Sequence, residues 1–256
     1  MFHTLEIDSD SSKVTNIADQ RKSSRSTHVQ HVLGYRSTDK PVDYEHEDIK
    51  LTNSVFTPRY FQFAGDWPNR ILISGTTLCG KSYFTSMIIR SYKKQFKDND
   101  VIIFSNLDED PILDKYKPTR IELSEDLIED PIELEELANS LVIFDDIDSL
   151  TNKSIRKAVH ELRDQIFATG RHHQIASITT SQLLLKGKES VGSLENTNLV
   201  VLFPVASRGQ VYSYFKDKMH FDKDLINKIC KLRTRWIVFH KACPMFILYE
   251  TGFFFI

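Results

Sequence analysis

The chain has 256 residues, enough for one large domain with a substantial core, and its 41% hydrophobic and 27% charged residues are ordinary for a globular protein. Its formal net charge of -2 excludes a uniformly basic protein that coats nucleic acid, so any contact with nucleic acid is expected to be local. The three widely spaced cysteines follow neither a metal-ligand pattern nor a disulfide framework and indicate a reducing compartment. No secretory signal and no apolar run of membrane-spanning length is visible, so we expect a soluble, intracellular protein.

The first 45 residues differ in composition from the rest of the chain. They are polar and rich in serine, and such a segment buries too little apolar surface to offset the entropy lost on ordering. We therefore predict a flexible polar arm over 1–45, followed by one folded domain over 46–256. Aromatic residues lead into the first core strand, where they are expected to pack in the core or at an interface, with contact to a nucleotide base as the alternative. These residues are Phe56, Tyr60, Phe61, Phe63 and Trp67.

The most informative stretch is an apolar strand over 70–74 that runs into Gly-Thr-Thr-Leu-Cys-Gly-Lys-Ser and then into a helix over 81–94. This order of strand, Gly-x-x-x-x-Gly-Lys-Ser loop and helix is the Walker A motif, which binds nucleotide phosphates. Gly75 and Gly80 allow backbone N–H groups to approach phosphate oxygens, and Lys81 reaches the β- and γ-phosphates. We expect ATP to be bound by Gly75, Thr76, Thr77, Leu78, Cys79, Gly80, Lys81 and Ser82, with the Ser82 hydroxyl also a ligand of Mg²⁺.

A second motif is an apolar strand that ends in two carboxylates, Asp145 and Asp146. It follows the Walker A unit and another buried strand over 100–105, and it has the pattern of Walker B. Asp145 is expected to hold the coordination shell of Mg²⁺ through water, and Asp146 to accept a proton from the attacking water or to position that water. Asp148 is the alternative base.

A helix is predicted over 152–169 from apolar residues spaced three and four apart, followed by a strand over 175–181. Gln182 ends that strand beside the expected γ-phosphate, where an amide can hydrogen-bond both phosphate and water; a plain polar strand end is the alternative. His172 and His173 lack further ligands at metal-binding spacing, so we assign them to a loop.

The remaining elements complete an α/β fold with a mostly parallel sheet flanked by helices. The basic loop around 186–188 either faces DNA phosphates or is an ordinary surface loop. The apolar C-terminal residues 252–256 are expected to dock on the core or on a neighbouring molecule.

The stretch 123–138 is acidic and predicted to be helical in parts. Further predictions are a strand over 199–203, helices over 208–219 and 222–232, and a C-terminal β-hairpin with strands over 236–240 and 245–249.

Together the Walker A stretch 75–82, the strand 141–146, and Gly-Arg-His at 170–172 followed by a strand ending in Gln182 resemble the HerA–FtsK group of motor ATPases. The Gly-Arg-His to Ser-Gln stretch most resembles the genome-packaging ATPases of poxvirus-like large DNA viruses and of virophages. The resemblance implies a RecA/ASCE-like P-loop NTPase fold, with an additional strand between the Walker A and Walker B strands. It further implies a hexameric or pentameric ring that hydrolyses ATP with Mg²⁺ and drives double-stranded DNA into a capsid. A viral capsid or portal partner and a location in the virion or at a viral assembly site follow from it.

The resemblance also implies an arginine that acts in a neighbouring subunit's site. Arg171 is the first candidate and Arg208 the second, each with a surface salt bridge as the plainer alternative. FtsK-like proteins usually end Walker B with Asp-Glu, whereas this chain has Asp145-Asp146, which leaves the assignment of the base open. A nucleotide-dependent switch or small-molecule kinase is the alternative function; a scaffold with a vestigial P-loop would not be expected to keep every one of these residues.

Overall fold

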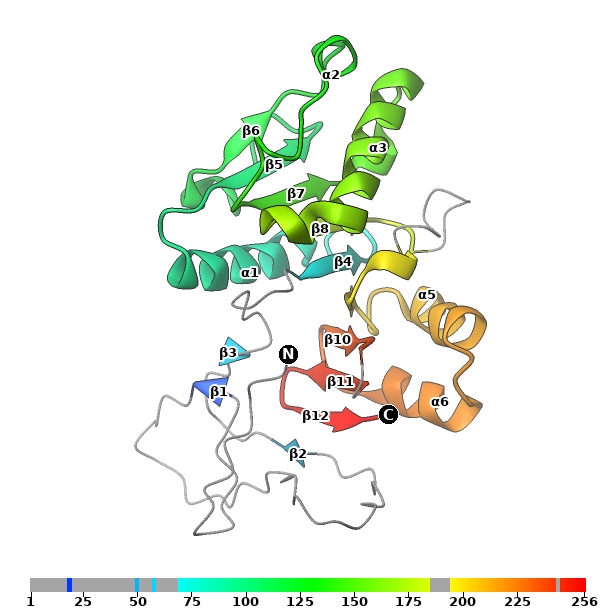
Figure 1. Cartoon of the computed structure of the whole chain (residues 1–256). Coiled ribbons are helices and arrows are strands. Elements are labelled where there is room, and N and C mark those ends of the chain that lie inside the picture. Colours follow the sequence, from blue (N-terminus) through cyan, green and yellow to red (C-terminus); the bar gives the residue numbers. More distant parts are fainter. Residues whose placement is uncertain (1–17, 20–48, 51–56, 59–68, 185–193, 243–244) are drawn as a thin grey trace.

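The core of the fold is one sheet with helices on both of its faces (Figure 1). The computed structural model of the chain describes residues 18–19, 49–50, 57–58, 69–184, 194–242 and 245–256. Its strands are β1 (Ala18–Asp19), β2 (Ile49–Lys50), β3 (Thr57–Pro58), β4 (Arg70–Ser74), β5 (Val101–Ser105), β6 (Thr119–Ile121), β7 (Leu141–Asp145), β8 (Ala176–Ser181), β9 (Leu199–Leu202), β10 (Ile237–His240), β11 (Phe246–Tyr249) and β12 (Gly252–Phe255). Its helices are α1 (Lys81–Gln95), α2 (Asp126–Glu129), α3 (Lys153–Thr169), α5 (Arg208–Ser213) and α6 (Lys223–Lys231), with 3-10 helices at Asp114–Tyr116, Ile147–Ser149 and Gly170–His173 and a π-helical turn at Tyr214–Lys218.

The strand order confirms the predicted fold class. The sheet runs β2-β12-β11-β10-β9-β4-β8-β7-β5-β6, and the block from β9 to β6 is parallel. β8 lies between the Walker A strand β4 and the Walker B strand β7, which confirms the additional strand expected there. Because the strands of this block are parallel, their carboxyl ends meet at one edge of the sheet, here called the carboxyl edge. The opposite edge, where these strands begin, is called the amino edge.

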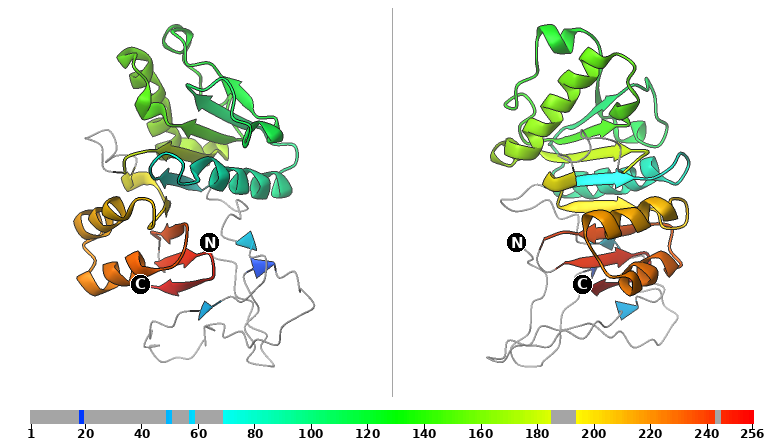
Figure 2. Two further views of the ribbon diagram at one scale, coloured as in Figure 1. Left: turned by 180° about the vertical axis from the view of Figure 1, so that it is seen from behind. Right: turned by 90° about the vertical axis from the view of Figure 1, so that its right-hand side faces the viewer.

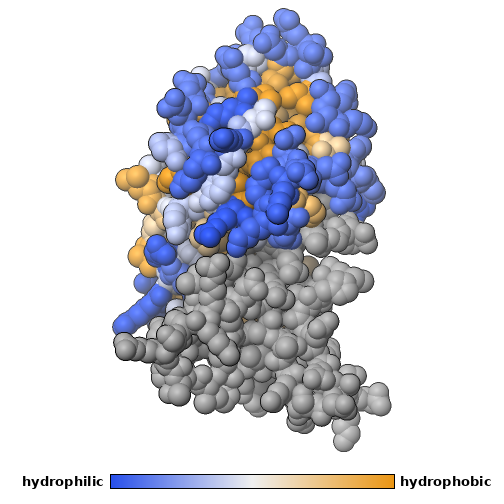
Figure 3. Space-filling model, turned by 90° about the vertical axis from the view of Figure 1, so that its left-hand side faces the viewer, coloured by the Kyte–Doolittle hydropathy of each residue, from blue (hydrophilic) through white to orange (hydrophobic). Residues whose placement is uncertain are grey.

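Alternate residues of β4 face opposite layers of helices. Ile71 and Ile73 pack with α1, and Leu72 packs in the cluster formed with α5 and α6. α3 packs on the same face as α5 and α6, over β5 and β7 (Figures 1 and 2). These central strands are buried on both faces, which explains their continuous apolar sequences. On the face seen from the left of Figure 1, hydrophilic side chains cover much of the described surface (Figure 3).

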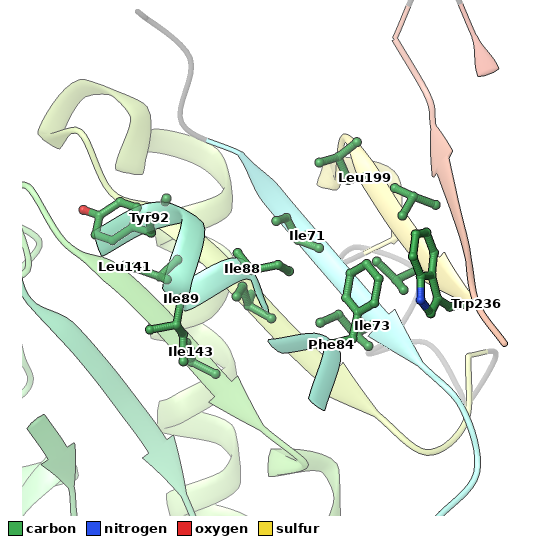
Figure 4. Close-up of a cluster of buried hydrophobic side chains, with 14 of the residues drawn as sticks. Ile71, Ile73, Phe84, Ile88, Ile89, Tyr92, Leu141, Ile143, Leu199 and Trp236 are labelled. Carbon is green, nitrogen blue, oxygen red and sulfur yellow. The ribbon is translucent and has the colours of Figure 1, made fainter. Parts of the chain in front are cut away.

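The first turn of α1 is held between the sheet and the C-terminal part of the chain. Phe84 is fully buried, and its ring meets Trp236 edge-to-face with centroids 5.0 Å apart (Figure 4). Trp236 immediately precedes β10 and so approaches α1 from the antiparallel part of the sheet. Burial of two large aromatic rings beside the loop that precedes α1 gives that loop a rigid base.

The C-terminal strands extend the sheet further than the sequence indicated. The predicted hairpin is present as β10 and β11, but its strands are not the outermost strands of the sheet. β12 pairs antiparallel with β11, and β2 pairs with β12. The apolar C-terminus therefore docks as a strand of this sheet, and Phe254 is fully buried. A four-residue strand of Gly and Phe carries no alternation from which to predict its pairing.

Some predictions are confirmed only in part, and others concern residues outside the described ranges. The acidic stretch 123–138 contains a single short helix, α2, and otherwise turns, so its helical content is lower than expected. The predicted helix 208–219 divides into α5 and the π-helical turn.

The arm 1–45 lies outside the described residues except for β1, which pairs with β3, and the domain boundary remains a prediction. The aromatic lead-in residues and the basic loop around 186–188 also lie outside the described residues. No helix in the described ranges is long and apolar enough to cross a membrane.

Candidate active site

The Walker A loop leaves the carboxyl edge between β4 and α1. The Gly75 N–H donates to the Ser181 carbonyl at 3.1 Å, which ties the start of the loop to the end of β8. Gly80 has φ of 108°, a left-handed conformation that glycine adopts without strain, and α1 begins at the next residue. The first N–H groups of a helix have no partner within the helix, so the loop presents donors and a positive dipole end to an anion. Leu78 at the tip of the loop is 99% exposed, whereas burial raises the pKa of the neighbouring Cys79 thiol.

Gly75 is required by packing. A Cβ atom at this position would lie 2.6 Å from the Cys79 Sγ and 2.7 Å from the Cδ2 of Phe203, a ring that is almost fully buried. Such contacts are far shorter than van der Waals distance, so the loop must shift if a side chain is added.

Replacing Gly75 by alanine is therefore expected to lower the free energy of unfolding by about 1–3 kcal/mol, the usual cost of overpacking. The matched control is Gly209→Ala, because nothing lies within 4 Å of a Cβ at Gly209 and that glycine sits inside α5. That control should be neutral or stabilising by about 0.4–1 kcal/mol. Urea unfolding measures both variants, and equal stability of Gly75→Ala and the wild type would contradict the packing argument.

Lys81 lies across the mouth of the site. Its Nζ donates to the Gly75 carbonyl at 3.2 Å and is 3.7 Å from Oδ2 of Asp146, and only 10% of its side chain is exposed. The lysine is therefore already held between the phosphate loop and the Walker B acid, and the structure brings together two residues that are 65 positions apart in the sequence.

Asp145 ends β7 in a buried position with two hydroxyl neighbours. Thr180 of β8 donates its hydroxyl to Oδ1 at 2.8 Å, and Ser105 of β5 lies 3.5 Å from Oδ2. Burial raises the pKa of this carboxyl, and the charge of Asp146 raises it further, against the lowering effect of Thr180 and Lys81. A divalent cation would relieve this unfavourable accumulation of negative charge.

Asp146 and Asp148 differ in which groups contact their carboxylates. Asp146 has a left-handed backbone with φ of 46°, and its N–H donates to the Thr180 hydroxyl at 2.9 Å. Asp148 accepts a hydrogen bond from the Ser181 hydroxyl at 3.0 Å, and its Oδ1 is 3.3 Å from the Nε2 of His160 on α3. Burial would raise the pKa of Asp148, but the hydrogen bonds from His160 and Ser181 and the nearby positive charges hold it below the usual value. The Asp148 carboxylate thus contacts Ser181 and His160, whereas the Asp146 carboxylate faces Lys81.

Gln182 follows β8 at the carboxyl edge, where its Nε2 donates to Oδ2 of Asp146 at 3.5 Å. The same carboxylate oxygen is therefore approached by Lys81 from the Walker A loop and by Gln182 from the strand between the two Walker strands. The side chain of Gln182 is exposed, so it can also reach a ligand at the mouth of the site.

The two candidate arginines lie at opposite edges of the sheet. Arg171 is an exposed residue of the 3-10 helix that precedes β8, so it lies at the amino edge. The six residues of β8 span roughly 20 Å, which separates Arg171 from the Walker A loop of its own chain. Arg208 begins α5 at the carboxyl edge, and it hydrogen-bonds the Cys230 thiol of α6. Of the two, Arg171 is the one separated by the length of β8 from the Walker A loop of its own chain.

His172 and His173 lie in the same 3-10 helix as Arg171. Among the residues that the structure describes, no group of three or more His, Cys, Asp or Glu side chains is arranged to hold a metal ion.

Sequence reasoning missed several residues that hold the site together. Thr180 donates to the Asp145 carboxylate and accepts the Asp146 N–H, Ser207 accepts the Thr76 N–H at 3.1 Å, and Phe203 lies under the Walker A loop. One signal was available, since the run Ser-Ile-Thr-Thr-Ser within β8 places hydroxyl residues in a fully buried strand. Buried hydroxyls need partners, and for Thr180 the partner is the Walker B acid Asp145. No comparable signal marks Ser207 or Phe203.

The Walker A loop at the end of β4, the acid pair at the end of β7 and the strand β8 between them define a P-loop NTPase. No family model matches the chain. It is 31% identical over 185 residues to uncharacterized protein V3 of the Sputnik virophage, covering 71% of this chain and 75% of that protein. The chain therefore belongs to the family of protein V3 of the Sputnik virophage. This confirms the resemblance to virophage proteins that was inferred from the motifs.

Solved structures that match part of the chain include viral packaging proteins. The genome packaging NTPase B204 from Sulfolobus turreted icosahedral virus 2, in complex with AMPPCP, is 12% identical, with a TM-score of 0.46, and the match covers 68% of this chain and 92% of that one. B204, the DNA-packaging ATPase from Sulfolobus turreted icosahedral virus, is 16% identical, with a TM-score of 0.47 and coverage of 68% and 93%. EccC of Thermomonospora curvata is 15% identical, with a TM-score of 0.40 and coverage of 62% and 34%.

Proposed function

We propose that this protein is an ATP-hydrolysing motor that translocates viral double-stranded DNA into the capsid. The observation that carries the proposal is the convergence of Lys81, Asp146 and Gln182, from three neighbouring strand ends, around one carboxylate oxygen at the mouth of the Walker A loop. Membership of a family with a virophage protein supports the viral setting. The proposed location is a site of virion assembly.

In this proposal the Walker A residues 75–82 hold the ATP phosphates through backbone N–H groups and Lys81. Ser82 and Asp145 offer a hydroxyl and a carboxylate, hard oxygen ligands of the kind that Mg²⁺ prefers, and a cation there would offset the effect of burial, which raises the pKa of Asp145. Bound Mg²⁺ would neutralise charge that develops on the phosphates.

In this proposal the remaining polar groups act on water. Asp146 would accept the proton of the attacking water or orient that water, because its carboxylate lies beside Lys81 and therefore beside the expected γ-phosphate. Gln182 donates to the same carboxylate and would lock its orientation while contacting the phosphate or the water. Lys81 would leave Asp146 for the phosphates when ATP binds, which would free the carboxylate for this work.

The charge distribution supports a head-to-tail assembly of subunits. Arg70, Arg171 and Lys241 gather at the amino edge, and burial together with the charge of Arg171 lowers the pKa of Arg70. The carboxyl edge carries the exposed acids Asp108 and Glu109 after β5, beside the Walker B pair. A contact between the basic residues of one subunit's amino edge and the acids of the next subunit's carboxyl edge would be heterologous, and such a contact closes into a ring where the rotation between subunits closes. Such a ring would place Arg171 of each subunit at the nucleotide of its neighbour, where it stabilises the transferring phosphoryl group.

The proposal is tested by measuring ATP hydrolysis with and without double-stranded DNA, together with the native mass of the assembly. We expect a ring and DNA-stimulated hydrolysis. A monomer that hydrolyses ATP without regard to DNA would instead support a nucleotide switch or a small-molecule kinase, and would overturn the motor assignment.

A mixing experiment tests the shared site. Lys81→Ala and Arg171→Ala subunits are each expected to be inactive alone, but a mixed ring contains interfaces with an intact loop on one side and an intact arginine on the other. Recovery of activity on mixing supports Arg171 acting in the neighbour's site. Recovery with Arg208→Ala in place of Arg171→Ala would assign that role to Arg208, and no recovery with either would contradict a site completed by an arginine of the neighbour.

A further inference from the structure

We propose that α5 is a positioning bridge between the phosphate loop and Gln182, formed by Ser207 and Gln210. The inference rests on the proposed function and adds two residues to its machinery. Neither residue belongs to a Walker motif, and both lie more than 25 positions away in sequence from the groups they hold.

Ser207 connects the helix to the phosphate loop. It lies just before α5, and its hydroxyl accepts the Thr76 N–H at 3.1 Å. Ser207 is buried, with only 6% of the residue exposed. Its own N–H donates to the Phe203 carbonyl at 2.8 Å, and the ring of Phe203 lies against the loop glycines. The loop is therefore held from this side by a hydrogen bond and by an aromatic contact.

Gln210 lies one turn further along and connects the same helix to the end of β8. Its Nε2 donates to the Gln182 carbonyl at 3.2 Å, and its Oε1 accepts the Leu184 N–H at 3.3 Å. Both ends of the amide are used, so the side chain holds the main chain on either side of Leu183. This matters because the Gln182 side chain is exposed and its contact with Asp146 is long, so that its position depends on its main chain.

The bridge stands on a rigid base. Val211, Tyr214 and Phe215 follow in the same helical segment and are fully or almost fully buried in the cluster beneath β9 and β10. A shift of the phosphate loop on nucleotide binding would be passed through Ser207 to α5 and through Gln210 to Gln182. Gln210 is thus a positioning residue for the chemical step, and Ser207 for nucleotide binding.

The kinetic test separates these two roles. Gln210→Ala is expected to lower kcat by about tenfold with the Kd for ATP changed less than about twofold, because misplacing a reacting group by a fraction of an ångström costs rate rather than affinity. Gln210→Glu keeps the acceptor for Leu184 but loses the donor to Gln182, and should be intermediate. Ser207→Ala is expected to weaken ATP binding several-fold, whereas Ser207→Thr keeps the hydroxyl and should bind like the wild type. Lys216→Ala, an exposed residue of the next turn, is the matched control.

A double-mutant cycle shows whether Gln210 acts through Gln182. If it does, Gln210→Ala added to Gln182→Ala causes no further loss of kcat. Fully additive losses, or a Gln210→Ala enzyme with wild-type kcat, would overturn the bridge.

Hydrogen exchange tests the same contacts without catalysis, so failure of the bridge is distinguishable from failure of the proposed function. Gln210→Ala should speed exchange of the Leu184 amide even in the protein without nucleotide. A non-hydrolysable ATP analogue should slow exchange over 182–184 in the wild type and have less effect in Ser207→Ala. Unchanged Leu184 exchange in Gln210→Ala overturns the bridge whether or not the wild type hydrolyses ATP, whereas a wild type that hydrolyses no ATP overturns the proposed function alone.

Discussion

Lys81→Ala is expected to reduce the rate of ATP hydrolysis by roughly a hundredfold or more, the usual scale for loss of one charged group that stabilises a transition state. Lys81 donates to the Gly75 carbonyl and lies 3.7 Å from Asp146, so its ammonium is at the mouth of the site, within reach of the position expected for the β- and γ-phosphates of a bound nucleotide. Its removal should also weaken ATP binding, because the phosphates lose a positive charge while the two Walker B carboxylates remain. A steady-state hydrolysis assay and calorimetric titration with an ATP analogue measure the two effects.

Two variants control this prediction. Lys157→Ala removes an exposed lysine of α3 that forms a surface pair with Glu161, and it should leave hydrolysis unchanged. Lys81→Arg keeps the charge but replaces a compact ammonium with a planar, bulkier group in a position that is 90% enclosed, so it should recover little activity. Hydrolysis by Lys81→Ala at the wild-type rate would show that the Walker A loop is not the catalytic nucleotide site.

The sequence predicts the parallel block of the sheet well for a physical reason. Strands buried on both faces must be apolar throughout, so 101–105 and 141–145 are recognisable as short runs without alternation. The Walker A loop is equally recognisable from the sequence, because phosphate binding requires glycine, lysine and a hydroxyl at fixed spacing. The apolar strand pattern and the Walker A motif are both local, because each lies within fewer than ten consecutive residues.

The contacts that complete the site are not local. The bond from Thr76 to Ser207 joins residues 131 positions apart, and that from Thr180 to Asp145 joins residues 35 apart. The run of hydroxyl residues in β8 suggests that Thr180 needs a partner but does not say which one, and nothing in the neighbourhood of Ser207 marks it as a partner of the Walker A loop. The pairing of β12 with β11 depends likewise on the shape of a sheet edge that only the folded chain creates.

The choice between Asp146 and Asp148 shows what geometry adds to a motif. From sequence, both acids follow the same strand and either is a possible base. In the fold, Ser181 and His160 occupy the Asp148 carboxylate and stabilise its ionised form, whereas Asp146 faces Lys81 and Gln182. The replacement of the usual Asp-Glu by Asp145-Asp146 is therefore accompanied by a glutamine and a lysine that both reach the shorter carboxylate.

Asp146→Asn is the second large effect that we expect. It should lower kcat by about a hundred- to a thousandfold, within the range for loss of a general base, while ATP binding is retained or slightly tightened. Binding persists because asparagine has the same shape and removes a negative charge beside the phosphates. Single-turnover hydrolysis and nucleotide titration distinguish the two quantities.

The matched variant is Asp148→Asn, which should keep kcat within a few-fold of the wild type but lower the stability of the fold. Because the pKa of Asp148 is depressed in the folded state, its carboxylate stabilises the fold above the unfolded-state pKa of about 4, and this contribution is lost as the pH falls through the lower folded-state value. The difference in unfolding free energy between Asp148→Asn and the wild type should therefore be largest near neutral pH and shrink in acid. If Asp148→Asn instead abolished hydrolysis while Asp146→Asn did not, the base would be Asp148, and the contacts from Ser181 and His160 would then orient a catalytic carboxylate.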